Sequence, residues 1–325
     1  RYPKQQIYWK GWQNRYRSEK EDCLSYLNVD RWIDGGGKWW YRHADGSYTR
    51  NDWERINGYW YYFDGSGWMQ TGWLKLDNSW YWLNGSGAMA TGWQKIGGSW
   101  YYFNGSGVIQ TGWLKLSNST YYLNGSGAML TGWQLINGNW YYMNGSGTML
   151  TGWQWIDNDW YYLYSNGVMR TGWLELGETK YYLDGSGAMR TGWFKVDSKW
   201  YYANGSGAMQ TGWLKTGNTW YYLNGSGIML TGWQWIGRAW YYLNGSGAMA
   251  TGWQSIGGKW YYLNGSGAMK TGWYKVGSNW YYSNPNGVMR YSTWIGDYYL
   301  LGDGRMATNR WVGGYYVGAD GKWVL

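Results

Sequence analysis

Hydrophobic and polar positions repeat along most of the chain with a period of 20 residues. In the stretch 93–103, WQKIGGSWYYF, two short runs rich in aromatic and aliphatic residues flank the turn formers at 97–99. Such runs are too short for a stable helix, and their composition favours strands. Each period therefore predicts a β-hairpin, here with strands at 93–96 and 100–103. The NGSG that follows predicts a second turn leading to the next hairpin.

The spacing of the hairpins is constant. A Gly-Trp dipeptide marks the start of each period, and Trp53, preceded by Asp52, continues the phase one period earlier. Equal spacing lets every hairpin meet its neighbours in the same way, as in a solenoid of stacked repeats. The Gly-Trp tryptophans are Trp73, Trp93, Trp113, Trp133, Trp153, Trp173, Trp193, Trp213, Trp233, Trp253 and Trp273.

The alternation of side chains along a strand assigns faces to these residues. The position at Ile96 is aliphatic in almost every period, from Ile56 to Val276, and predicts a continuous inner core. The preceding residue is often lysine, as at Lys95, and is expected to be solvated. Tyrosines equivalent to Tyr101 are interpreted as packing between repeats. The predicted fold is all-β, a solenoid of tandem 20-residue β-hairpins.

Three segments are expected along the chain. Residues 1–30 do not fit the period and are predicted to be a cap, a linker or the remnant of another domain. Residues 31–290 form the tandem repeats, of which 31–52 is a longer variant. Residues 291–325 contain shorter, out-of-phase copies that are expected to cap the array. Since the first residue is Arg1, the chain is interpreted as a mature or trimmed product.

Composition narrows the possible functions. The chain has 34 Trp and 37 Tyr but only 3 Phe, so its rings suit partly wet surfaces rather than one dry core. With a single cysteine, Cys23, and a single histidine, His43, no disulfide or metal cluster is expected. No catalytic residues and no cofactor are predicted, nor a membrane span. The net charge of +9 is spread too thinly for a nucleic-acid surface.

The repeated aromatic columns indicate a binding function. A tryptophan flanked by further rings can hold a quaternary ammonium group, because the ring faces attract the cation and its methyl groups gain apolar contact. No carboxylate is needed, and acidic residues never occupy a repeated aromatic column. We therefore interpret the Gly-Trp tryptophans and the first Trp of each WYY as binding residues rather than as packing alone.

The pattern TGWxxxxxxWYYLNGSGAM, recurring over about residues 53–290, resembles the choline-binding repeat of Gram-positive surface proteins, autolysins and phage lysins. The resemblance implies a left-handed superhelix of β-hairpins with choline held between consecutive repeats. It also implies a cage of two Trp from one repeat, a Tyr from the next, and often a Met as a further wall.

Carried onto this sequence, the resemblance predicts eight cages and a set of fourth walls. The cages are Trp73, Trp80 and Tyr102; Trp93, Trp100 and Tyr122; Trp133, Trp140 and Tyr162; Trp153, Trp160 and Tyr182; Trp193, Trp200 and Tyr222; Trp213, Trp220 and Tyr242; Trp233, Trp240 and Tyr262; and Trp253, Trp260 and Tyr282. The fourth walls are Met129, Met149, Met169 and Met189.

Some periods depart from the pattern. Thr120 and Lys180 replace the second Trp, so sites built on Trp113 and Trp173 are not expected to bind. Lys180 in particular would place a positive charge where the ligand's cation should lie. Trp82 replaces a Tyr and should preserve a wall.

The predicted function is a non-catalytic, secreted cell-wall attachment module that binds choline or phosphocholine on teichoic or lipoteichoic acids with multivalent avidity. Two alternatives remain open from the residues alone. Sugars also stack on Trp and Tyr, so the array could be a glucan- or glycan-binding module. It could equally be a structural spacer or fibre that self-associates through its aromatic columns. An enzyme such as a cell-wall hydrolase could precede the module.

Overall fold

The computed structural model describes residues 28–324, and the regular secondary structure of this part is entirely β-strand. The predicted all-β class is confirmed. The strands are β1 (Arg31–Asp34), β2 (Trp39–Arg42), β3 (Asp52–Ile56), β4 (Tyr59–Phe63), β5 (Gly72–Leu76), β6 (Ser79–Leu83), β7 (Gly92–Ile96), β8 (Ser99–Phe103), β9 (Gly112–Leu116), β10 (Ser119–Leu123), β11 (Gly132–Ile136), β12 (Asn139–Met143), β13 (Gly152–Ile156), β14 (Asp159–Leu163), β15 (Gly172–Leu176), β16 (Thr179–Leu183), β17 (Gly192–Val196), β18 (Lys199–Ala203), β19 (Gly212–Thr216), β20 (Thr219–Leu223), β21 (Gly232–Ile236), β22 (Ala239–Leu243), β23 (Gly252–Ile256), β24 (Lys259–Leu263), β25 (Gly272–Val276), β26 (Asn279–Ser283), β27 (Thr293–Ile295), β28 (Tyr298–Leu300), β29 (Arg310–Val312), β30 (Tyr315–Val317) and β31 (Trp323–Val324).

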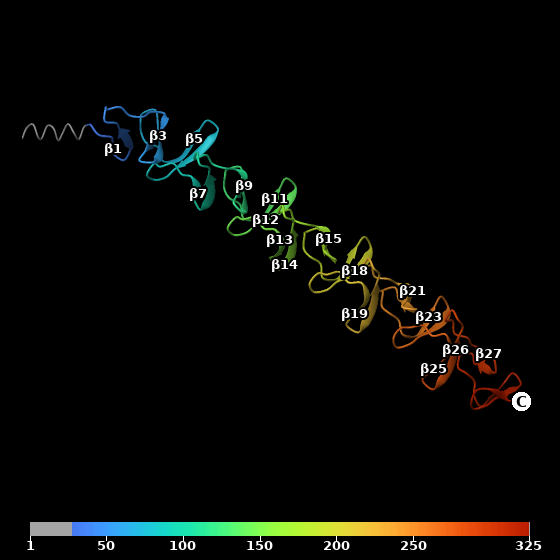
Figure 1. Cartoon of the computed structure of the whole chain (residues 1–325). Helices are drawn as coiled ribbons and strands as arrows, with labels where there is room; N and C mark the ends of the chain where they lie inside the picture. The colour runs from blue at the N-terminus through green and yellow to red at the C-terminus, as the bar shows by residue number, and fades with distance from the viewer. Residues whose placement is uncertain (1–27, 325) are drawn as a thin grey trace, which may run out of the picture. The chain divides into compact units, whose positions relative to one another are not determined.

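Each odd-numbered strand up to β27 pairs antiparallel with the strand that follows it, which gives a series of hairpins (Figure 1). Strands β29, β30 and β31 form one three-stranded sheet. The tandem 20-residue hairpins are therefore confirmed. The turn is shorter than predicted, because Ser99 already belongs to β8 and only Gly97 and Gly98 connect the strands. Both glycines have positive φ, at 56° and 89°. This is the backbone twist that two-residue hairpin turns require.

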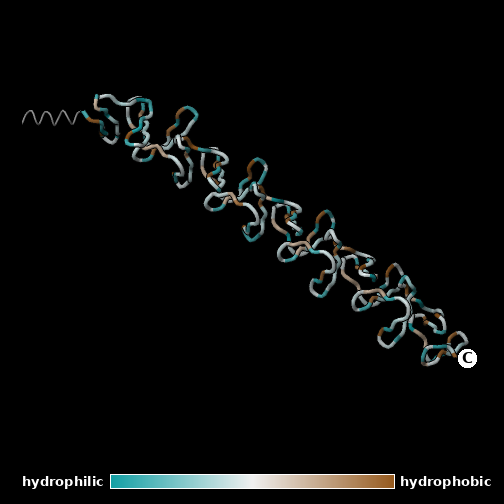
Figure 2. The backbone as a smooth tube through the Cα atoms, in the orientation of Figure 1, coloured by the Kyte–Doolittle hydropathy of each residue, from teal (hydrophilic) through white to brown (hydrophobic). Residues whose placement is uncertain are grey.

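The chain divides into two compact units. One contains the described residues up to Gly152 together with Leu163–Met169, and the other contains Trp153–Tyr162 and the residues from Arg170 onwards. Figure 2 shows short apolar and polar segments alternating along the hairpins in both units, with no extended apolar segment. Of the predicted N-terminal segment, residues 1–27 lie outside the described residues. In the predicted C-terminal segment, strands β27 to β30 have only three residues each.

The NGSG turn is a compact structure held by its asparagine. At residues 224–227, the Asn224 side-chain oxygen accepts hydrogen bonds from the backbone N–H groups of Ser226 (2.9 Å) and Ile228 (3.0 Å). The Gly227 N–H also donates to the Asn224 carbonyl (2.8 Å). Short polar side chains commonly satisfy turn backbone in this way. The predicted turn is confirmed.

Consecutive repeats are joined by a backbone hydrogen bond and by a methionine–glycine contact. The Met249 N–H, in the connection after the β21–β22 hairpin, donates to the carbonyl of Trp220 in the preceding hairpin over 2.8 Å. The side chain of Met209 lies against Gly227, whose φ is +79° and where any Cβ would collide with the Met209 sulfur. The last glycine of NGSG is therefore required for both its conformation and its close approach.

The core column differs from the prediction. The position equivalent to Ile96 is only half-buried in most repeats, although Ile56, Ile136 and Ile156 are buried. The continuous core is instead the last residue of each second strand, at which side chains are fully buried. The aliphatic position precedes the turn at the hairpin tip, where solvent reaches it, whereas the end of the second strand is enclosed by the connection to the next repeat. The core residues are Phe63, Leu83, Phe103, Leu123, Met143, Leu163, Leu183, Ala203, Leu223, Leu243, Leu263, Ser283, Leu300 and Val317.

Two hairpins fill this core in a different way. Where the core residue is the small Ala203, the first strand carries the buried Phe194, whose ring stacks on Tyr201 with centroids 5.8 Å apart. Where it is Ser283, the first strand carries the buried Tyr274, whose hydroxyl is hydrogen-bonded to the Ser283 hydroxyl (2.9 Å). Burial raises the pKa of Tyr274 to about 12, so the phenol stays neutral at ordinary pH. In each hairpin a large ring compensates for a small core residue.

This compensation can be tested with Tyr274 and Ser283. Each single variant, Tyr274→Phe or Ser283→Ala, leaves the other hydroxyl buried without its partner, which is expected to destabilise the protein by about 1–2 kcal/mol. The double variant recreates the Phe194–Ala203 pair and should recover most of this loss. Urea unfolding of all four proteins measures the coupling free energy. If the double variant lost as much unfolding free energy as the two single variants together, the hydrogen bond between the two hydroxyls would not be the source of the stabilisation.

Candidate ligand-binding site

The hairpin geometry brings together the two tryptophans of five predicted pairs, and Trp253 and Trp260 of a sixth line one pocket. Trp213 in β19 and Trp220 in β20 have ring centroids 6.3 Å apart and planes at 89°, so the two indoles form a right-angled corner. The same corner recurs in other repeats with centroids 6.2–6.5 Å apart. These further pairs are Trp73 with Trp80, Trp133 with Trp140, Trp153 with Trp160, and Trp233 with Trp240.

The tyrosine of the next repeat is not the one predicted. Trp213 contacts Tyr241, the first Tyr of the following WYY, with centroids 4.9 Å apart. Tyr242 points instead to Trp233, its cross-strand partner in the same hairpin, at 5.2 Å. Tyr101 packs between repeats as predicted, since its ring centroid lies 5.1 Å from that of Trp73 in the preceding repeat, and it also lines the pocket at the indole corner. Each predicted cage tyrosine instead contacts the Gly-Trp tryptophan of its own hairpin. These tyrosines are Tyr102, Tyr122, Tyr162, Tyr182, Tyr222, Tyr242, Tyr262 and Tyr282.

A groove opens at this corner. At Trp213 its lining consists of Trp213, Trp220, Tyr241, Met249, Gly265 and Ser266, and its volume is about 280 Å³. Grooves lined by the corresponding tryptophan pair and tyrosine are found at Trp73, Trp253 and Trp273, and each is named below after that first tryptophan. In the Trp73 groove Ile109 takes the place of the methionine.

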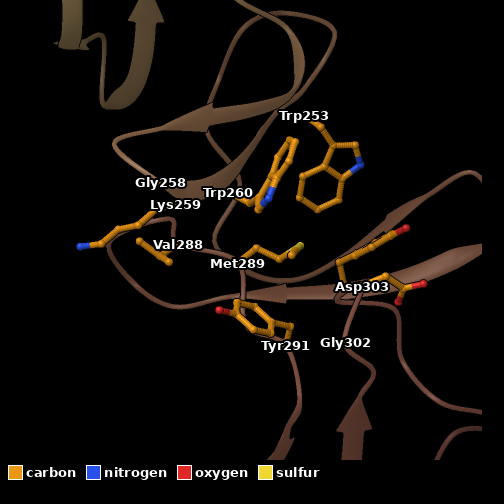
Figure 3. A pocket seen from close by; sticks show the side chains of 10 residues that line it. Trp253, Gly258, Lys259, Trp260, Val288, Met289, Tyr291, Gly302 and Asp303 are labelled. Carbon is orange, nitrogen blue, oxygen red and sulfur yellow. The ribbon is translucent and has the colours of Figure 1, made fainter.

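The second indole of the pair stays partly open to solvent. Trp220 is 40% exposed, and its equivalents in the other repeats that have a second Trp are exposed to a similar extent. In the Trp253 groove, Figure 3 shows the indoles of Trp253 and Trp260 side by side, with Met289 below them. The predicted Met walls hold the place of Met249, because each donates its backbone N–H to residue 100, 120, 140 or 160 as Met249 does to Trp220. They are Met129, Met149, Met169 and Met189.

The rings, rather than acidic groups, set the electrostatics of the Trp73 and Trp213 grooves, which we call the regular grooves. No aspartate or glutamate lines the Trp73 or Trp213 groove. The ammonium of Lys215 nevertheless lies 5.9 Å from the Trp220 ring centroid, and Lys75 and Lys195 lie similarly over Trp80 and Trp200. Since the face of an indole attracts a cation, an open indole corner is suited to a ligand that carries one.

The repeats without a second Trp keep the scaffold but lose a wall. Met149 donates its N–H to the carbonyl of Thr120, as its equivalents do to tryptophan. Lys180 supplies no ring. Its ammonium forms an ion pair with Glu175 in its own hairpin, with nitrogen and oxygen 2.7 Å apart, so its charge already has a partner. Trp82 contacts Trp73 at 5.2 Å in the manner of the tyrosines that it replaces.

Three further features bear on other kinds of site. Within residues 28–324, no group of three or more His, Cys, Asp or Glu side chains is placed to hold a metal ion. His43 lies 3.4 Å from a carboxylate oxygen of Glu54. Within the described residues there is no helix with the length and apolar character that a membrane-spanning helix needs.

Models of three repeat families match almost the whole repeat array. A choline-binding repeat model matches residues 50–91, 90–131, 150–191, 190–231 and 230–271. A second choline-binding repeat model matches residues 288–323, and a putative cell wall binding repeat model matches residues 131–149 and 271–289. A search of curated proteins found no match.

Among solved structures, the chain is similar to CbpJ from Streptococcus pneumoniae TIGR4, with 35% identity over 91% of this chain and 100% of that chain and a TM-score of 0.40. It is also similar to choline binding protein F from Streptococcus pneumoniae, with 34% identity over 91% of this chain and 99% of that chain and a TM-score of 0.45. From the matched repeats, the chain belongs to the choline-binding repeat family.

Proposed function

We propose that this chain is a non-catalytic attachment module that binds choline groups of the cell wall in the grooves between consecutive repeats. The observation that carries the proposal is the Trp213 groove, in which two indoles, a phenol and a thioether surround an open space without an acidic group. A trimethylammonium head has a positive charge and an apolar surface, and such a lining complements both. Membership of the family, and its cell-wall binding repeats, support a location at the cell surface.

Teichoic or lipoteichoic acid decorated with phosphocholine is the polymer we propose as the natural partner. One groove buries few ligand atoms and should bind free choline weakly. Several grooves acting on one polymer add avidity of roughly 10²- to 10⁴-fold for each suitable linkage of two sites. The net charge of +9 also favours the phosphates of such a polymer.

The test is retention on a matrix that carries choline or a tertiary amine. Such a matrix is positively charged, and a chain of net charge +9 is repelled by it unless a specific site binds the amine. We expect retention, and elution by millimolar free choline but not by sodium chloride at the same concentration. A chain that passes through both matrices, or that choline does not elute, would refute choline binding.

A glycan-binding function is a second candidate, which two exposed tryptophans favour. Trp155 and Trp235 are 57% and 59% exposed, and their ring centroids lie 5.5 Å from those of Trp160 and Trp240, the second indoles of their corners. Flat exposed rings of this kind also stack on sugars. Elution of the protein from a glucan or peptidoglycan matrix by oligosaccharide, and not by choline, would favour this candidate over the first.

A further inference from the structure

Each regular groove is lined by three consecutive repeats rather than two. In the Trp213 groove the indoles come from one hairpin, Tyr241 from the next, and Ser266 from the NGSG turn that follows the hairpin after that. The Trp73 groove has the same arrangement, with Ser126 at this position. The serine of the third repeat is therefore a polar position that both linings share, and the Trp73 groove has Asn78, Ser79 and Thr111 in addition.

The shortened repeats near the C-terminus replace this serine by aspartate. In GDGRM and ADGKW the aspartate stands before the glycine, as the serine does in NGSGAM. Asp303 accordingly lines the Trp253 groove, at its edge in Figure 3, and Asp320 lines the Trp273 groove with Trp280, Tyr298 and Met306. The Trp273 groove has a volume of about 310 Å³, close to that of the Trp213 groove.

The two aspartates differ in their partners. The Asp303 carboxylate accepts a hydrogen bond from the Arg305 side chain (2.6 Å) and another from the Arg305 N–H (3.0 Å). Burial acts to raise the pKa of Asp303, but these bonds and the Arg305 charge outweigh it and the pKa is lowered. Asp320 accepts one hydrogen bond, from the Lys322 N–H (3.0 Å), and no ion pair between described residues includes it. Of these two aspartates, Asp320 is therefore the one without a cationic partner.

Resting on the proposed function, we propose that Asp320 makes the Trp273 groove the array's charge-selective choline site. There the carboxylate attracts the ligand's positive charge in addition to the rings, whereas in the Trp213 groove the rings act alone. The Trp273 groove then binds choline more tightly than the Trp213 groove does. It also discriminates more strongly against 3,3-dimethylbutan-1-ol, the neutral molecule of choline's shape in which carbon replaces the ammonium nitrogen.

Methionine methyl groups allow each groove to be measured separately. Met306 lines the Trp273 groove and Met249 lines the Trp213 groove. In protein labelled with ¹³C at its methionine methyls, these two resonances are assigned from Met306→Leu and Met249→Leu variants. Choline and the neutral alcohol are then titrated in turn, and the shift of each resonance gives the affinity of its groove.

The variants exchange the polar residue between the grooves. Asp320→Asn retains an oxygen for the Lys322 N–H and removes only the charge, while Ser266→Asp introduces the charge into the Trp213 groove. We expect Asp320→Asn to weaken choline binding reported by Met306 about three- to fivefold, the effect typical of an exposed charge pair. Ser266→Asp should strengthen the binding reported by Met249 by a similar factor. Neither change should alter the affinity for the neutral alcohol.

The outcomes separate this inference from the function on which it rests. Equal choline affinities at Met306 and Met249, or an Asp320→Asn variant that binds choline as the original protein does, would overturn the role of Asp320 and leave choline binding intact. A parallel loss of affinity for the neutral alcohol would also overturn it, because the aspartate would then act on groove shape. If choline shifts no methionine resonance at all, the proposed function itself fails.

Discussion

Replacement of Trp220 by threonine is expected to weaken choline binding in the Trp213 groove by tenfold or more, while the other grooves keep their affinity. The substitution removes one wall of the indole corner, and with it a cation–π contact of roughly 0.5–2 kcal/mol together with the apolar contact of the methyl groups. Threonine is the residue that the chain already carries at position 120. Isothermal titration calorimetry should therefore find one fewer bound choline per chain, and the Met249 methyl resonance should no longer respond.

The reciprocal variant, Thr120→Trp, is the matched control. Trp113 and Tyr141 already stand at the correct distance, with ring centroids 4.8 Å apart, and Met149 is hydrogen-bonded to residue 120 as in complete grooves. Supplying the missing indole should add one bound choline per chain, reported by the Met149 resonance. An unchanged stoichiometry in both variants would show that the second tryptophan is not a wall of the site.

Replacement of Leu223 by alanine is expected to lower the free energy of unfolding by about 2–5 kcal/mol, the range for a buried leucine whose removal leaves a cavity. Leu223 is fully buried at the end of β20 and forms an isolated β-bridge with Met229. A repeat protein is stabilised by contacts between neighbouring repeats, so the loss should be felt at this place in the array first. Urea unfolding measures the total, and amide hydrogen exchange identifies the repeats that open.

Leu135→Ala serves as the control, since Leu135 is 57% exposed and its loss should change the stability by no more than about 0.5 kcal/mol. A variant at the partly buried aliphatic position, Leu116→Ala, should lie between the two. If Leu116→Ala proved as costly as Leu223→Ala, the ranking of the two columns derived from burial would be wrong.

The period, the hairpins and the paired tryptophans could be predicted because each depends on short-range sequence patterns. Turn residues recur every 20 positions, and the residues equivalent to Trp213 and Trp220 lie diagonally on the same face of a single hairpin. The tyrosine could not be assigned in this way. Strand alternation shows that Tyr241 and Tyr242 point to opposite faces, but which face meets the preceding repeat depends on the rotation between hairpins, and no local pattern encodes that rotation.

The core column was missed for a related reason, although a signal for it was present. The residue after WYY is Leu in most repeats, and it is small only at Ala203 and Ser283, where Phe194 and Tyr274 stand in the first strand. Such paired changes of volume indicate two side chains that share one space. The third-repeat contribution of Ser266 and Asp320 had no such signal, because residues so far apart in sequence meet only through the stacking of the repeats.

The hydrogen bond from Met249 to the carbonyl of Trp220 has a consequence for how such an array can change. The acceptor is a backbone atom, so it remains whichever side chain occupies that position, as at Thr120 and Lys180. Recognition and assembly are thereby uncoupled. Single substitutions can switch individual sites on or off without removing the hydrogen bond between repeats. Selection can therefore adjust the number of binding sites one repeat at a time.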